Sequence, residues 1–86
     1  MPTISTFYGI VIRMFFREHA PPHFHVEYGG HTAEIAIETL DVLAGELPRR
    51  TLSLVLEWAV LHRAELRDNW ELCRQHKQPH RIEPLE

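Results

Sequence analysis

The chain has little of what marks an exported, membrane-bound or nucleic-acid-binding protein. Its single cysteine, Cys73, cannot form an internal disulfide, and we expect it to pack in the core. The sequence shows no signal peptide and no long apolar run, which predicts a protein of the reducing cytoplasm with no membrane contact. Basic residues are in deficit, with 9 Lys and Arg against 12 Asp and Glu. This excess of acidic residues predicts that the protein does not bind nucleic acid directly.

What is present is typical of one folded domain spanning residues 1–86. Hydrophobic residues make up 44% and charged residues 24% of the chain, which excludes a disordered protein. A chain of this length buries a hydrophobic core that is only marginally sufficient to stabilise a folded monomer. Oligomerisation is therefore expected.

In three runs, successive side chains alternate between the two faces of an extended strand. These runs are also rich in strand-favouring residues, which predicts three antiparallel strands. They are Phe7–Phe16, His23–Tyr28 and His31–Ile37.

A two-residue turn at Gly29-Gly30 sets the register of the second hairpin. If Tyr28 faces His31, then His25 lies opposite Glu34 and Phe24 lies opposite Ile35. Phe24 and Ile35 then share an apolar face that a helix can cover. His25 and Glu34 share the polar face.

The second half of the chain predicts helix. Thr39 is suited to cap a short helical turn that ends at Gly45, and Pro48 suits the first turn of a long helix reaching about Gln75. A break at Asp68-Asn69 is the alternative. The predicted fold is α+β, with a three-stranded antiparallel meander packed against one long C-terminal helix.

This helix would be longer than the sheet. At about 1.5 Å per residue it would extend roughly 40 Å, whereas the strands would span about 20–23 Å. The overhanging end carries Leu66, Trp70 and Cys73, and the tail with Ile82 and Leu85 could cover only part of it. The geometry predicts at least a dimer.

The main candidate site is the segment His19-Ala20-Pro21-Pro22-His23-Phe24-His25, in which two prolines stiffen the presentation of three imidazoles. His23 and His25, at i and i+2 on one strand face, could chelate a divalent metal such as zinc, with Glu34 or His19 as the third ligand. The same imidazoles could instead contact a partner protein, which we rank first. His62 is expected to be a packed histidine bonded to a neighbour.

Arg49 and Arg50 form a second candidate site. Cations in the first turn of a helix oppose its dipole, at a cost of about 0.3–1 kcal/mol each. Either an acidic neighbour compensates for them, or they are kept for a partner. The predicted partner-binding residues are His19, His23, His25, Glu34, Arg49 and Arg50.

Several segments together resemble the bacterial domain-of-unknown-function family 4160. They are Pro2–Ile10, His19–Val26, Gly45–Arg50, Glu57-Trp58, His62–Leu66, Asn69-Trp70 and Ile82–Leu85. The chain departs from the family pattern in having Glu18 before His19 where an Asp is expected, which keeps the charge. The resemblance implies a small cytoplasmic protein, often encoded beside another small uncharacterised protein, as in a toxin–antitoxin pair.

The function predicted from these observations is that of a non-enzymatic interaction protein, possessing no cofactor, that forms a homo-oligomer and binds a small protein encoded nearby. Two alternatives stay open. One is a metal-binding protein that uses His23 and His25. The other is a nuclease-type toxin with a local cluster of Arg13, Arg49 and Arg50, although the acidic balance of the chain counts against it.

Overall fold

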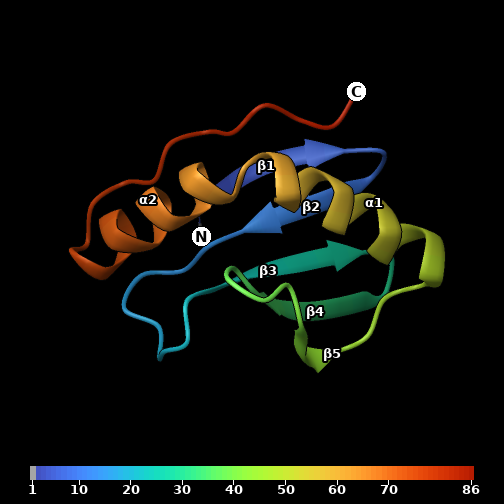
Figure 1. Ribbon diagram of the computed structural model, residues 1–86, viewed down its shortest axis with the longest axis horizontal. Coiled ribbons are helices and arrows are strands. Elements are labelled where there is room, and N and C mark those ends of the chain that lie inside the picture. The colour runs from blue at the N-terminus through green and yellow to red at the C-terminus, as the bar shows by residue number, and fades with distance from the viewer. Residues whose placement is uncertain (1) are drawn as a thin grey trace.

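The fold is an antiparallel sheet with two helices on one face, as Figure 1 shows for this computed structural model, which describes residues 2–86. The strands lie in the order β1-β2-β3-β4-β5, and the tail after α2 runs back along β1. The elements are β1 (Thr3–Phe7), β2 (Ile10–Arg13), β3 (His23–Tyr28), β4 (His31–Ala36), β5 (Val42–Gly45), α1 (Arg49–Leu61) and α2 (Arg63–Arg74). The α+β class is confirmed, but the prediction of three strands and one long helix is wrong in detail.

The first predicted strand, Phe7–Phe16, contains a turn. Phe7 pairs with Ile10, and the two residues between them, Tyr8 and Gly9, have φ of +51° and +78°. Positive φ at both central positions is what a tight hairpin turn requires. Because tyrosine rarely adopts this conformation, the turn was hidden in a run that reads as continuous strand.

The predicted helical turn that ends at Gly45 is also wrong, because Val42–Gly45 forms the edge strand β5. Thr39 does cap a turn, with its Oγ1 accepting a 3.3 Å hydrogen bond from the Asp41 amide. Gly45 pairs with Ala33 and has φ of +73°, and a Cβ placed there would lie 2.1 Å from the Thr32 carbonyl oxygen. The glycine therefore serves a close approach between strands and does not end a helix.

The register of the β3–β4 hairpin is confirmed. Tyr28 pairs with His31, His25 with Glu34, and Phe24 with Ile35. Phe24 and Ile35 are fully buried, and Phe24 meets Trp58 of α1 edge to face at 5.9 Å between ring centroids. The helices cover this apolar face, so odd-numbered residues of β3 point to the other side of the sheet.

The long helix is broken at His62, and not at Asp68-Asn69. His62 has φ of −124° and ψ of 24°, and its amide bonds to the Ala59 carbonyl in place of continuing the helical pattern. Its Nδ1 donates to Glu65 in the first turn of α2 at 2.5 Å, and its ring lies 5.6 Å from that of Trp58. His62 is thus a packed histidine bonded to a neighbour, as predicted. Over residues 2–86, neither helix is long and apolar enough to cross a membrane.

The C-terminal tail covers the surface that was expected to overhang the sheet. Ile82 donates its amide to the Ile4 carbonyl at 2.7 Å, and Trp58 Nε1 donates to the Glu83 carbonyl at 2.8 Å. Asn69 exchanges two 2.9 Å hydrogen bonds with the backbone of His80.

The apolar side chains at the far end of the helices, Leu66, Trp70 and Cys73, are consequently buried within one chain. Because the helix is broken and the tail packs on it, the helix end no longer needs a second subunit to cover it. The reason given above for a dimer therefore does not hold. Oligomerisation stays a prediction that rests on chain length alone.

Candidate functional site

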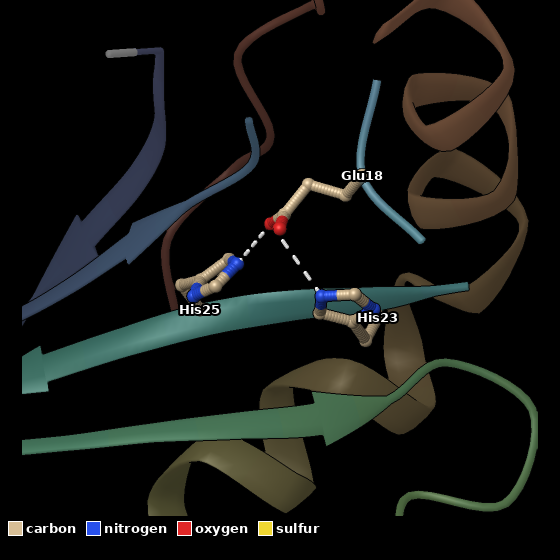
Figure 2. Close-up of side chains that lie close together, drawn as sticks. All are labelled: Glu18, His23 and His25. Carbon is tan, nitrogen blue, oxygen red and sulfur yellow. Dashed lines mark hydrogen bonds and ion pairs between the residues drawn. The ribbon is translucent and has the colours of Figure 1, made fainter. Parts of the chain in front are cut away.

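The candidate site lies where the loop of residues 14–22 joins β3. His23 and His25 alternate with buried Phe24, so both imidazoles project from the same side of β3. The loop crosses above them and brings Glu18 down towards both rings, as Figure 2 shows. The loop is tied to α2 by a 3.4 Å hydrogen bond from the Arg17 amide to the Cys73 carbonyl.

The Glu18 carboxylate sits between the two imidazoles. Its Oε1 contacts Nε2 of His25 and lies 3.4 Å from Nε2 of His23. One donor atom from each of the three residues can be chosen so that all lie within 4.8 Å of one another. Two imidazole nitrogens and one carboxylate oxygen therefore converge on one point.

The orientation of His23 is set by the prolines before it. Its Nδ1 lies 2.7 Å from the Pro21 carbonyl oxygen. Because a carbonyl only accepts, Nδ1 carries the hydrogen, and the neutral ring then presents the lone pair of Nε2 to the Glu18 carboxylate. A lone pair facing a carboxylate is favourable only with a positive charge between them, carried by a proton on Nε2 or by a metal ion.

Aromatic rings pack against the two histidines. His25 meets Phe15 edge-on at 4.3 Å between centroids, and His23 lies 5.2 Å from Trp70. The side chains of His23 and His25 are only 7% and 18% exposed. The pair is therefore not part of an open, fully solvated strand face.

Glu34 lies at the rim of the site. Its Oε1 is 3.8 Å from His23 Nε2, and its side chain is 40% exposed. Beside it, a hollow of about 110 Å³ is lined by His25 and Glu34 together with Phe15 of the loop and Gly45 of β5. Of the three converging residues, only His25 lines this hollow.

The other predicted site residues are not brought here. His19 is exposed and is not among the donors that converge. Arg49 and Arg50 begin α1, at the end of the sheet where β3 finishes, whereas His23 begins β3 (Figure 1). Arg13 donates to Glu27 at 2.9 Å on the sheet, so it does not join the two arginines in the basic cluster that a nuclease reading required.

Glu18 is the residue that sequence reasoning missed. It lies five positions before His23 in an irregular loop, so no strand or helix periodicity links the two. The only signal was that an acidic residue directly precedes the histidine segment, and we attached no role to it.

Cys73 is not part of the cluster of Glu18, His23 and His25. It is buried, and burial raises the pKa of its thiol, so the thiolate needed for metal binding or nucleophilic attack is disfavoured. The expectation that it packs in the core is confirmed.

A comparison with protein families matches residues 9–71 to the model described as a domain of unknown function, DUF4160. The match covers more than half of the chain and includes the loop, β3 and most of α2, which confirms the resemblance drawn from the sequence. No curated protein and no solved structure matches the chain.

Proposed function

The chain belongs to the DUF4160 family, whose description assigns no role, and we therefore propose a function from the site itself: the protein binds a divalent transition metal through Glu18, His23 and His25. The observation that carries the proposal is the convergence of these three donors (Figure 2). Zinc is the reference ion, because imidazole and carboxylate are among its usual ligands.

The spacing of one donor pair, His23 and Glu18, fits a metal. Zinc binds imidazole nitrogen and carboxylate oxygen at about 2.0–2.2 Å, so two donors on one ion lie roughly 3–4 Å apart. His23 Nε2 and Glu18 Oε1 are already 3.4 Å apart. The hydrogen bond from His23 Nδ1 to the Pro21 carbonyl is the kind of outer contact that fixes the tautomer of a metal-bound histidine.

The charges also favour a cation. Glu18 and Glu34 place two carboxylates around two imidazoles, with Oε1 atoms 3.4 and 3.8 Å from His23 Nε2. With neutral imidazoles, a divalent ion would balance both carboxylates. Among the ion pairs described for residues 2–86, Arg13 is joined to Glu27, and Glu18 is joined to His23 and His25.

Three protein ligands leave at least one position of a tetrahedral ion for water or an exogenous ligand. The hollow lined by His25 and Glu34 would give access to that position, and Glu34 would accept a hydrogen bond from a bound water. Binding would also join the loop of Glu18 to β3, so the metal would stabilise the fold by linkage. The alternative, an interaction protein, draws on the same polar face of the sheet and on Arg49 and Arg50 at its other end, and its toxin–antitoxin context comes from the family resemblance alone.

The test is a zinc titration of the apo protein. At a free zinc concentration of 100 Kd, linkage adds about 2.7 kcal/mol, which for a domain of this size raises Tm by roughly 10–20 °C. The variant Glu18→Gln keeps the shape of the side chain but removes the anionic ligand. We expect it to lower zinc affinity by at least about tenfold, measured by calorimetry.

The matched control is Glu57→Gln, the same change at an exposed position of α1. It should bind zinc as the parent does. If the parent shows neither heat of binding nor a rise in Tm with zinc, cobalt, nickel, manganese or ferrous iron, the proposed function is wrong, and Glu18 and the histidines are held together by protons.

A further inference from the structure

A second surface, independent of the metal proposal, lies at the opposite end of the sheet. There the tips of the β1–β2 and β3–β4 hairpins and the first turns of α1 enclose a hollow of about 390 Å³. Tyr8 and Tyr28 form one wall, and Arg50 and Leu54 form the other. The tyrosines are 59% and 36% exposed, so each offers ring surface to a ligand.

A neighbouring hollow of about 290 Å³ lies along the other side of Arg50. It is lined by Arg49, Arg50, Ser53 and Leu54. Because Arg50 and Leu54 line both hollows, the two adjoin. An extended segment could pass from one to the other beside the two arginines.

Arg49 and Arg50 have no acidic partner among residues 2–86. The first turn of α1 has no acidic residue, and Pro48 before it provides no side-chain cap. Within residues 2–86, neither Arg49 nor Arg50 makes a side-chain hydrogen bond or an ion pair that meets the usual distance criteria. Two cations thus stand at the positive end of a helix dipole, which destabilises the free protein.

We propose that these hollows dock an acidic segment of a partner protein. A carboxylate of the partner pairs with Arg50 and Arg49, and an adjoining apolar side chain lies against Tyr8, Tyr28 and Leu54. Charge complementarity argues for this occupant, because the site is basic while the chain as a whole carries a net charge of −3, which disfavours nucleic acid. Aromatic rings and arginine are also the side chains most enriched at the centres of protein interfaces.

The test uses a phage-displayed library of random dodecapeptides, selected on the parent protein. We expect the enriched peptides to carry an acidic residue beside an apolar or aromatic one. A synthetic copy of an enriched peptide should bind the parent in fluorescence polarisation, and Arg50→Glu should weaken that binding at least about tenfold. Lys77→Glu, the same charge change on the exposed tail, should leave it within about twofold.

The folding of the variant is checked in the same samples. Because Arg50→Glu places an anion in the first turn of α1, it should raise Tm by about 1–5 °C, so lost binding would not reflect lost structure. The proposal is overturned if the enriched peptides are neutral or basic, or if their binding is insensitive to Arg50→Glu. Light scattering that shows an association of the parent abolished by Arg50→Glu would assign the hollows to a second copy of the chain instead.

Discussion

Replacing His25 with alanine should abolish the zinc-dependent rise in Tm while leaving the apo protein folded. His25 supplies one of the three converging donors, and its loss leaves two, with an affinity at least about a hundredfold weaker. The imidazole contacts Phe15 and Glu18 but is not part of the helix-covered core, so the apo stability should fall by only about 1 kcal/mol. Differential scanning fluorimetry with and without zinc measures both quantities.

The control for this experiment is His31→Ala. His31 is exposed on β4 near the turn and has no side-chain partner among the contacts described for residues 2–86. It should respond to zinc as the parent does. If His25→Ala keeps the full zinc response, the ion binds elsewhere. If His25→Ala unfolds the apo protein, His25→Gln, which keeps a polar side chain of similar length, should restore folding without restoring the zinc response.

Replacing Trp58 with alanine should remove a large part of the stability of the protein. Trp58 is fully buried, packs against Phe7 and Phe24 at 5.5 and 5.9 Å between ring centroids, and donates Nε1 to the Glu83 carbonyl. Removing a buried tryptophan costs about 3–5 kcal/mol, against a typical total of about 5–15 kcal/mol. Urea denaturation followed by circular dichroism measures the loss.

Two further variants separate the causes. Trp58→Phe retains much of the apolar surface and loses the bond to the tail, so its loss should be smaller, near 1–2 kcal/mol. Val60→Ala, at a position that is 57% exposed on the same helix, should stay within about 0.5 kcal/mol of the parent. A loss for Trp58→Ala no larger than that for Val60→Ala would show that the described packing of helix on sheet is wrong.

The parts of the fold that sequence reasoning recovered are those that local pattern controls. Gly29-Gly30 between two alternating runs was sufficient to give the register of β3 and β4, and hence the position of His25 opposite Glu34. The apolar residues Leu66, Trp70 and Cys73, which marked helix surface that had to be covered, are buried. Period and turn chemistry act over a few residues, so they can be read directly from the chain.

The parts that were missed depend on contacts distant in sequence or on unusual backbone conformation. Tyr8 with positive φ concealed the first hairpin, and Gly45 marks a close approach to Thr32, which belongs to another strand. The break at His62 has no proline or glycine to announce it. Glu18 reaches the histidines from an irregular loop, which contacts α2 through the Arg17 amide and the Cys73 carbonyl, far apart in sequence.

The candidate site was therefore recovered in part. His23 and His25 were identified from spacing, but the third ligand was expected to be Glu34 or His19, and the donor set contains Glu18 instead. Arg49 and Arg50 were singled out by their conflict with the helix dipole. The structure places no acidic residue in the first turn of α1, and a partner for the two arginines stays a prediction.

The most direct test of the account is an anomalous difference map from a crystal of the protein grown with stoichiometric zinc and measured on both sides of the zinc absorption edge. We predict one strong peak at about 2.0–2.2 Å from Nε2 of His23, Nε2 of His25 and a carboxylate oxygen of Glu18, with water or an exogenous ligand in the remaining position. A map in which zinc occupies other residues, or in which Glu18 and the two imidazoles contact each other with no peak between them, would contradict the claim that this family member is a metal-binding protein.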